Sequence, residues 1–283
     1  MLGRALIRLI DAQERWARPF GDWLHGLVDA IFGRAVPVRS FLNGTWLGHP
    51  LHAVLTDAPI GALFLVIVLD LLGQPTAADI ALAFGILAML GAALAGFADY
   101  SVTDGTARAR ATVHGTVMVL ALVLYLVSLV LRSGDPVDRT APIAISIVAF
   151  LVLAAGAYVG GDVVYLLGNM VDRHAWRPAG AKWAALEVGE LAEGVPVRAK
   201  LGIQNLVLVR SGEVIHALHD QCAHAGGPLS GGQIVDGCIE CPWHGSRFEL
   251  AMGHRRRGPS VYDQPAYEVR VAEGGGYEAR RLS

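Results

Sequence analysis

The sequence Cys222-Ala223-His224 is followed, after sixteen further residues, by Cys241-Pro242-Trp243-His244. Each part pairs one cysteine with one histidine, and this stretch decides how the C-terminal part of the chain is interpreted. Thiolate and neutral imidazole are both ligands of transition metals. The stretch therefore predicts a metal centre built from Cys222, His224, Cys241 and His244.

Two kinds of metal centre use these ligands. One is a structural zinc site, but zinc fingers usually place cysteine near cysteine and histidine near histidine along the chain. The other is an iron–sulfur cluster with two thiolates on one iron and two imidazoles on the other, which allows the alternation found here. Glycines beside the ligands favour the cluster, because a residue without Cβ lets backbone N–H groups approach bridging sulfides closely. We favour the cluster and keep zinc as the alternative.

The ligand spacing and its surroundings resemble the Rieske [2Fe-2S] family. Gly226-Gly227-Pro228-Leu229-Ser230 follows the first pair, Gly245 follows the second, and Gly258-Pro259 lies further along the chain. The resemblance implies one [2Fe-2S] cluster held by two ligand loops and covered by a proline-containing loop. Five residues are implied around the ligands: Gly226, Gly227, Gly245, Ser246 and Pro259.

Departures from the respiratory members of this family bear on the reduction potential. Those members carry an extra cysteine in each loop, joined as a disulfide, where this chain has Gly227 and Trp243. Ser246 keeps a hydroxyl that could bond a sulfide, but Phe248 replaces an expected tyrosine. Fewer hydrogen bonds to sulfur lower the potential, so we expect a ferredoxin-like centre of low to intermediate potential. The third cysteine, Cys238, is expected to be a packed thiol.

The composition changes near Trp183 to short alternating runs that are typical of strands and are separated by breakers such as Gly202 and Gly212. Residues 183–283 are therefore expected to form a small antiparallel all-β domain, in agreement with the Rieske resemblance. A linker, residues 173–182, precedes this domain.

Four apolar segments occupy about residues 51–72, 79–99, 112–131 and 142–167. Each has about the 20 residues that are needed to cross a bilayer. Helices of a soluble bundle would show polar stripes at helical spacing, and these segments show almost none. Because short connections make neighbouring helices antiparallel, residues 41–172 are predicted to form an all-α, four-helix, up-down-up-down transmembrane domain.

The entrance to this domain, Gly48-His49-Pro50-Leu51-His52, and the later Thr56-Asp57-Ala58-Pro59-Ile60-Gly61 carry a second resemblance. They resemble a widespread group of four-helix bacterial membrane proteins marked by Gly-His-Pro-Leu-His. The resemblance covers roughly residues 40–172 and implies an architecture rather than an activity.

The predicted topology places polar residues of the helices at one membrane face. Ionisable groups in membrane spans are candidates for function by default. The first and third helices run in the same direction, so His52 and His114 are expected at similar depth, with Thr112 capping the third helix. A bis-histidine haem b, a quinone or metal site, and plain hydrogen bonding to helix-start N–H groups all remain open. The residues of this candidate membrane site are His49, His52, Asp57, Asp99, His114 and Asp162.

Residues 1–40 form an N-terminal region with an amphipathic helix over 2–32, in which apolar positions such as Trp16 and Trp23 recur at helical spacing. Pro19 is expected to bend or divide this helix. Mixed tryptophan and arginine indicate a helix lying at the surface of a lipid bilayer. Packing against the next domain is the alternative.

The distribution of cations predicts orientation. Two cations, Arg132 and Arg139, lie in the loops of the opposite face, whereas seven flank the histidine-rich face: Arg34, Arg39, Arg108, Arg110, Arg173, Arg177 and Lys182. The positive-inside rule then puts both termini and the β domain on the cytoplasmic side of a bacterial cytoplasmic membrane. The net charge of −2 gives no indication of nucleic-acid binding.

These features predict a membrane-anchored protein that transfers single electrons between its cluster and an unidentified redox partner protein or quinone. No catalytic residue is assigned, and the oligomeric state is not specified by the sequence. A quinone-reactive oxidoreductase and a cluster-based redox sensor are the alternatives. A complete Rieske oxygenase is not expected, since the 39 residues after His244 leave no room for its iron-containing catalytic domain.

Overall fold

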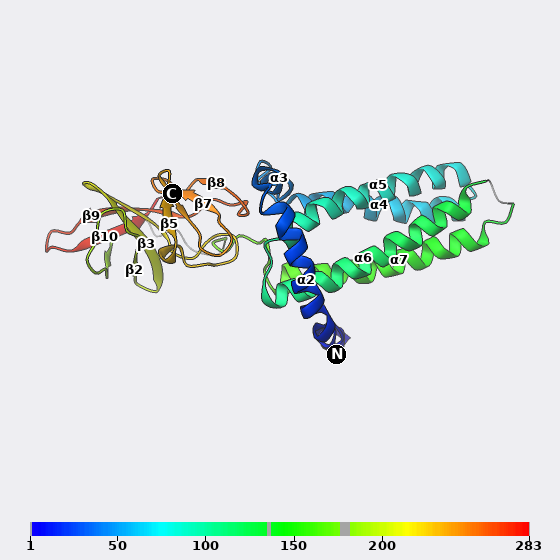
Figure 1. Cartoon of the computed structure of the whole chain (residues 1–283), viewed down its shortest axis with the longest axis horizontal. Coiled ribbons are helices and arrows are strands. Elements are labelled where there is room, and N and C mark those ends of the chain that lie inside the picture. Colours follow the sequence, from blue (N-terminus) through cyan, green and yellow to red (C-terminus); the bar gives the residue numbers. More distant parts are fainter. Residues whose placement is uncertain (1, 135–136, 176–181, 283) are drawn as a thin grey trace. The chain divides into compact units, whose positions relative to one another are not determined.

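The computed structural model describes residues 2–134, 137–175 and 182–282 (Figure 1). The chain divides into two compact units. One comprises Met1–Asn43 and Pro50–Asn169, and the other comprises Gly44–His49 and Met170–Ser283. The first unit is helical and the second contains the β-sheets. The predicted order, an all-α membrane domain followed by an antiparallel β domain, is therefore confirmed.

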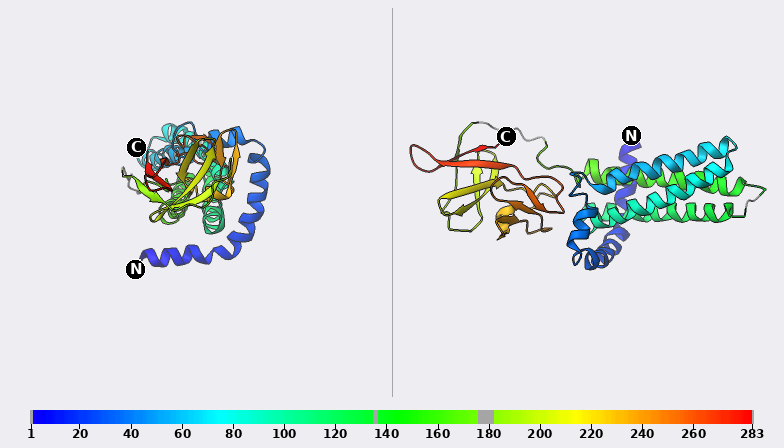
Figure 2. Two further views of the ribbon diagram at one scale, coloured as in Figure 1. Left: turned by 90° about the vertical axis from the view of Figure 1, so that its left-hand side faces the viewer. Right: turned by 90° about the horizontal axis from the view of Figure 1, so that it is seen from above.

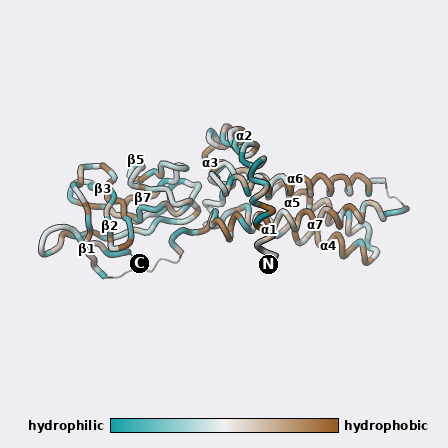
Figure 3. The backbone as a smooth tube through the Cα atoms, turned by 90° about the horizontal axis from the view of Figure 1, so that it is seen from below, coloured by the Kyte–Doolittle hydropathy of each residue, from teal (hydrophilic) through white to brown (hydrophobic). Residues whose placement is uncertain are grey.

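Four helices of the first unit are long and apolar enough to cross a membrane, and among the described residues no others are (Figure 3). Their bounds are α4 (Leu51–Leu71), α5 (Pro75–Tyr100), α6 (Gly105–Arg132) and α7 (Thr140–Gly161). A short π-helical turn, η1 (Asp162–Leu166), continues α7. Pro75 at the first position of α5 suits a helix start, because its fixed φ is helical and its missing N–H needs no partner there.

The start of α6 differs from the prediction. The helix begins at Gly105, so Thr112 lies inside it and its hydroxyl donates 2.8 Å to the carbonyl of Arg108. The expected capping role of Thr112 was therefore wrong. Charged residues occupy this extra length of α6 because ion pairs stabilise them there: Arg108 binds Asp22 at 2.8 Å, and Arg110 binds Asp11 at 2.7 Å.

The four long helices form two antiparallel hairpins. α4 packs along α5 and α6 packs along α7, while contacts between the two hairpins are fewer (Figure 1). Gly85 of α5 allows a close approach, since a Cβ there would lie 2.6 Å from a methyl carbon of Leu63. The shared core includes the fully buried Leu63, Leu82 and Tyr125.

A buried ionic network joins three of the long helices at the end of the bundle where each hairpin turns. Arg132 of α6 donates to both carboxylate oxygens of Asp70, at 2.9 and 2.6 Å, and to Asp79 at 3.0 Å. The side chains of Arg132 and Asp70 are each 1% exposed. Arg139, which precedes α7, also pairs with Asp79. Paired in this way, the arginine and the two aspartates can be accommodated at the end of an apolar bundle.

Three further helices precede the bundle: α1 (Leu2–Ala12), α2 (Glu14–Phe32) and α3 (Val36–Leu42). The break between α1 and α2 is at Gln13, and Pro19 lies within α2, so the expectation that Pro19 divides the helix was wrong, whereas a bend at Pro19 stays a prediction. Gln13 sustains the break because its side chain donates 3.2 Å to the carbonyl of Leu9 and accepts 2.9 Å from the indole of Trp16.

One face of α2 packs against the bundle. The hydroxyl of Tyr100 donates 2.8 Å to the carbonyl of Gly21, where a Cβ would lie 2.5 Å from the hydroxyl oxygen of Thr112. Figure 2 shows α1 and α2, in dark blue, curving around the outside of the bundle across the direction of its long helices. The packing given above as the alternative is thus present. A set of large apolar side chains stays exposed: Leu9, Trp16, Phe20, Trp23, Leu27 and Ile31.

The second unit contains two antiparallel sheets. The larger has the order β1-β10-β9-β4-β3-β2 and the smaller the order β5-β6-β7-β8. The larger sheet is built from β1 (Ala184–Leu186), β2 (Val197–Leu201), β3 (Gln204–Ser211), β4 (Val214–His219), β9 (Ala266–Val271) and β10 (Tyr277–Arg281). The smaller is built from β5 (Gln233–Val235), β6 (Cys238–Glu240), β7 (Arg247–Glu249) and β8 (Arg255–Arg257). A short 3-10 helix, η2 (Leu229–Gly231), precedes β5.

The substitution Asp70→Asn tests the ionic network. It keeps the volume but leaves the Arg132 charge with Asp79 as its only carboxylate, so we expect unfolding in detergent to require about 3 kcal/mol less free energy. Asp138→Asn, at an exposed aspartate near the start of α7, is the matched control and should change stability far less. Equal losses for the two variants would contradict a stabilising role of the buried pair.

Candidate metal centre

The four predicted ligands lie on two loops that are closed in the same way. In the first loop, between β4 and η2, Gly226 N–H donates 2.9 Å to the carbonyl of Cys222. In the second, between β6 and β7, Gly245 N–H donates 3.1 Å to the carbonyl of Cys241. Both glycines have positive φ, 88° and 75°, which a residue with a side chain rarely adopts. Each loop therefore bends back within two residues of its histidine, at Gly226 in the first loop and at Gly245 in the second.

The two loops bring ligand side chains of the same type together. The rings of His224 and His244 lie with centroids 5.0 Å apart at 86°. The thiols of Cys222 and Cys241 are hydrogen-bonded to each other, and both are buried. Cysteine and histidine alternate along the sequence, but in space thiol meets thiol and imidazole meets imidazole. This arrangement fits two irons, each with one pair of ligands.

The same arrangement bears on the zinc alternative. A structural zinc ion requires four ligands around a single point. Within the described residues, no three His, Cys, Asp or Glu side chains gather as a site for one ion would need. Two separate pairs of like ligands suit a di-iron cluster better than a tetrahedral ion.

Thiolate is the form of cysteine that binds metal. The hydrogen bond from Cys222 lowers the pKa of Cys241 to about 7, helped by the backbone N–H groups of Trp243 and His244. The same bond, together with burial, raises the pKa of Cys222 well above its usual range. The site thus stabilises one thiolate through its own hydrogen bonds, before any positive charge of a metal is considered.

Gly227 provides the space beside the thiols. A Cβ at this position would lie 2.9 Å from the sulfur of Cys241 and 2.9 Å from the ring of Trp243. The backbone of Gly227 also takes part in the loop, because its carbonyl accepts 2.9 Å from Cys222 N–H. Packing therefore requires a glycine at position 227, and its backbone carbonyl helps to close the loop.

The predicted covering segment lies against the second ligand loop. Pro259 and Ser260 are buried, and Ser260 N–H donates 3.0 Å to the hydroxyl oxygen of Ser246. A hydroxyl that accepts one hydrogen bond can still donate its own proton. Ser246 therefore links the two segments while keeping a donor for a sulfide.

A residue that the sequence analysis missed, Gln264, lies just before β9 and holds the first ligand loop. Its side chain is buried, its amide nitrogen donates to the carbonyls of His219 at 2.5 Å and Gln221 at 2.7 Å, and its oxygen accepts 2.9 Å from Ala223 N–H. No motif marks this glutamine, because its partners lie more than 40 residues away in the sequence.

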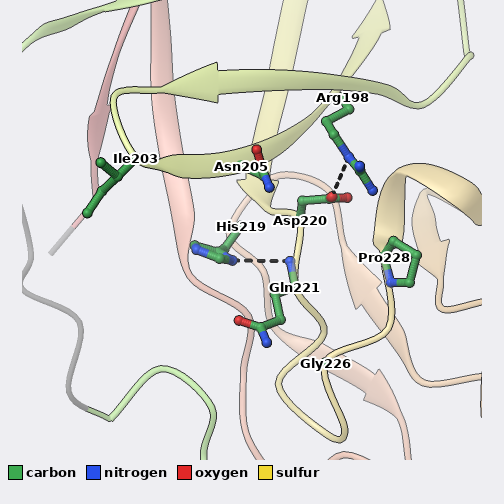
Figure 4. A pocket seen from close by; sticks show the side chains of 8 residues that line it. All are labelled: Arg198, Ile203, Asn205, His219, Asp220, Gln221, Gly226 and Pro228. Carbon is green, nitrogen blue, oxygen red and sulfur yellow. Dashed lines mark hydrogen bonds and ion pairs between the residues drawn. The ribbon is translucent and has the colours of Figure 1, made fainter.

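A polar pocket lies behind the first ligand loop (Figure 4). Asp220 accepts 2.9 Å from Arg198 and 2.7 Å from Ser230 N–H, while Gln221 N–H donates 3.1 Å to the ring of His219. These bonds hold the residues just before Cys222. The pocket therefore belongs to the support of the loop.

The arginines of β8, just before Gly258-Pro259, also support the site. Arg257 donates 2.9 Å to the carbonyl of Gly245 and pairs at 2.9 Å with Glu240, which Arg247 also binds. Arg256 pairs at 2.8 Å with Glu249. The positive charges of Arg256 and Arg257 are thus balanced within the unit. Cys238 on β6 is buried, as expected for a packed thiol.

The structure divides the residues predicted for a membrane site. His52 and His114 meet, with ring centroids 6.2 Å apart. Asp99 is buried and accepts 2.6 Å from the side chain of Asn43, and Asp162 lies 3.6 Å from Arg110. The remaining two residues, His49 and Asp57, are exposed. The structure therefore brings two of the six predicted residues, His52 and His114, together.

Comparison with protein families matches two parts of the chain. Residues 182–268 match the Rieske [2Fe-2S] domain, and residues 48–173 match a group described as "Predicted membrane protein (DUF2231)". Both resemblances inferred from the sequence are confirmed. The Rieske domain implies a [2Fe-2S] cluster, with which the sorted pairs of ligand-type side chains agree.

Individual relatives are similar to the β domain. The chain is 30% identical to the "Anthranilate 1,2-dioxygenase ferredoxin subunit" of Burkholderia cepacia, covering 35% of this chain and 86% of that protein. It is 34% identical to "Ferredoxin CarAc" of Metapseudomonas resinovorans, covering 28% of this chain and 75% of that protein. It is 31% identical to human "Apoptosis-inducing factor 3", covering 31% of this chain but 14% of that longer protein.

Gly227→Ala tests the space beside the thiols. The added methyl group would displace Cys241 or Trp243, so we expect less iron and acid-labile sulfide per chain after anaerobic purification. Gly231→Ala is the matched control, because a Cβ there would meet Pro242 at an ordinary 3.8 Å. Full cluster content in Gly227→Ala would refute the packing requirement.

Proposed function

Because this chain belongs to the Rieske [2Fe-2S] family through its C-terminal domain, we propose that Cys222 and Cys241 hold one iron of the cluster and that His224 and His244 hold the other. The observation that carries this assignment is the sorting of the side chains, thiol beside thiol and imidazole beside imidazole. When bound, such a cluster supplies one-electron transfer. The protein is an iron–sulfur electron carrier with a membrane domain.

The residues around the site position the ligands and exclude water. Cys222, Cys241 and His224 are buried, whereas His244 is partly exposed and is followed by the glycine turn at Gly245. Trp243 beside it is 53% exposed. We infer that a redox partner protein approaches at His244, the most exposed of the four ligands, with Trp243 as an apolar contact.

Membrane attachment gives this carrier a fixed location. Four apolar helices suit a lipid bilayer, and the exposed apolar side chains of α1 and α2 suit its interface. A tethered carrier meets a membrane-bound partner at high effective concentration. We propose that the partner is a protein or cofactor at the same membrane.

The orientation is proposed from the cations. Six of the seven cations counted near the histidine-rich face are among the described residues, and Arg177 lies outside them. Two cations, Arg132 and Arg139, lie at the opposite end. Ion pairs occur at both ends: Asp70 and Asp79 bind Arg132 and Arg139, while Asp22 and Asp11 bind Arg108 and Arg110. We therefore propose that both termini and the Rieske domain lie in the cytoplasm, at a bacterial cytoplasmic membrane.

Two versions of the function differ in what the bundle contains. A quinone-reactive oxidoreductase needs a quinone site, and a carrier with a second redox centre needs ligands for a cofactor such as haem b. The facing His52 and His114 favour the second version. A cluster-based redox sensor would share the cluster, and no contact among the described residues favours it over electron transfer.

Metal analysis tests the ligand assignment. The full chain, purified anaerobically in mild detergent, is expected to contain iron and acid-labile sulfide in equal amounts and to give a Rieske-type EPR signal when reduced. Cys241→Ser should lose this signal, while Cys238→Ser, at a buried cysteine outside the ligand loops, should keep it. Zinc in place of iron, or loss of the signal in Cys238→Ser alone, would contradict the assignment.

Protease accessibility tests the orientation. Protease added to intact cells should leave the Rieske domain uncleaved, and the same protease added to inverted vesicles should remove it. Cleavage in intact cells would place the domain outside.

A further inference from the structure

His52 of α4 and His114 of α6 face each other from different hairpins of the bundle. Their rings lie with centroids 6.2 Å apart and planes at 79°. Both rings are partly buried. Two histidines from helices that are not neighbours along the chain thus meet at one depth of the bundle.

Each ring is fixed by a hydrogen bond to the second helix of its own hairpin. His52 Nδ1 lies 2.8 Å from the carbonyl oxygen of Ala92 on α5, and His114 Nδ1 lies 2.8 Å from that of Gly156 on α7. A carbonyl oxygen can only accept, so Nδ1 must carry the proton in both rings. The neutral ring then has a lone pair on Nε2, which is the tautomer of a metal-binding histidine oriented by a backbone carbonyl.

The support of the two rings is duplicated. One helical turn after each accepting carbonyl is a glycine, Gly96 on α5 and Gly160 on α7. A Cβ at Gly96 would lie 3.0 Å from His52 Nδ1, and one at Gly160 would lie 2.9 Å from His114 Nδ1. Each hairpin therefore repeats the same device: a histidine on its first helix, and a carbonyl and a glycine on its second.

The separation of the rings agrees with two ligands on opposite sides of one metal. With a metal–nitrogen bond of about 2.1 Å and a ring centroid roughly 1.1 Å behind the nitrogen, two such imidazoles have centroids about 6.4 Å apart. The observed 6.2 Å is close to this value. The spacing of the two rings therefore matches that of two axial ligands.

The number of protein ligands at this pair indicates which kind of metal centre it suits. A zinc or non-haem iron site takes three or four ligands from protein side chains. In the described part of the chain, no third His, Cys, Asp or Glu joins this pair. A metal with two protein ligands on opposite sides takes its remaining donors from outside the protein, and a macrocycle supplies four of them at once, as for the iron of haem.

The surroundings also suit a flat, anionic cofactor. Contacts between the two hairpins are fewer than contacts within them, so a flat cofactor would disturb less packing between the hairpins than within one. Arg110 is one turn before His114 on the same face of α6, and its side chain is 7% exposed. Nη2 of Arg110 binds Asp11, and Nη1 lies 3.6 Å from Asp162 Oδ2 in an ion pair without a hydrogen bond. Nε is buried without a hydrogen bond and suits a carboxylate of the cofactor.

We propose that His52 and His114 are the axial ligands of a haem held between the two hairpins, with Arg110 binding one of its propionates. The use of this haem as a second one-electron centre rests on the proposed electron-transfer function, whereas its binding does not.

The test is the absorption spectrum of the full chain, purified in mild detergent from cells supplied with a haem precursor. We expect one haem per chain and a reduced-minus-oxidised spectrum of a six-coordinate, low-spin iron. His52→Ala and His114→Ala should each lose at least about nine-tenths of the haem. His49→Ala, at the exposed histidine three residues before His52, is the matched control and should keep it. The EPR signal of the cluster, read in the same samples, should persist in all three variants and shows that they fold.

Two further variants separate ligation from packing. His114→Met should retain haem with an altered spectrum, because methionine can also serve as an axial ligand. Arg110→Gln should bind haem several-fold more weakly with the axial spectrum unchanged, while Arg108→Gln, its control, should not.

Two results would overturn the proposal. One is wild-type protein that shows the cluster signal but binds no haem after reconstitution, including protein that yields a quinone on extraction instead. The other is full haem content in a His52→Ala/His114→Ala double variant. Absence of the cluster signal in wild-type protein that binds haem would instead refute the proposed function and leave the haem site standing.

Discussion

The bend that follows each pair of ligands is the constraint on which the Rieske unit depends. Gly226 and Gly245 turn the chain back so that their N–H groups reach the carbonyls of Cys222 and Cys241. Because both loops close in the same way, their side chains meet by type rather than in sequence order. The consequence is a pair of thiols and a pair of imidazoles, which a two-iron cluster requires and a single ion does not.

Long-range hydrogen bonds keep these two loops in place. Gln264 holds the first loop through three bonds, and Arg257 holds the carbonyl of Gly245 in the second. Leaving a buried polar partner unsatisfied costs about 1–3 kcal/mol, so each bond makes a displaced loop unfavourable. Rigid loops keep the surroundings of a redox centre the same in both oxidation states.

The membrane unit places its polar groups at two ends for different reasons. At one end, Arg132 and Asp70 satisfy each other, and their role is explained by stability alone. At the other end, His52 and His114 are bound through Nδ1 to backbone carbonyls, which leaves a lone pair on the second nitrogen of each ring. An ion pair that is complete needs no ligand, whereas two oriented imidazoles are suited to bind one.

Much of this protein could be predicted from the order of its residues. The four apolar segments determined the helical membrane domain. A helix of about 20 apolar residues satisfies its backbone hydrogen bonds internally and is long enough to cross a bilayer. Cys222, His224, Cys241 and His244 indicated the Rieske cluster, since ligand type and spacing are local properties of a sequence. The similar depth of His52 and His114 followed from helix direction alone.

Other features were decided by the tertiary structure. The sorting of thiols and imidazoles, the role of Gln264 and the pairing of Arg132 with Asp70, 62 residues away, have no local pattern. The helix break at Gln13 instead of Pro19, and the early start of α6, likewise depend on hydrogen bonds and ion pairs of particular side chains. Periodicity and composition determine which segments are helices, strands or ligand loops, but which buried donor meets which acceptor is determined only when the segments pack together.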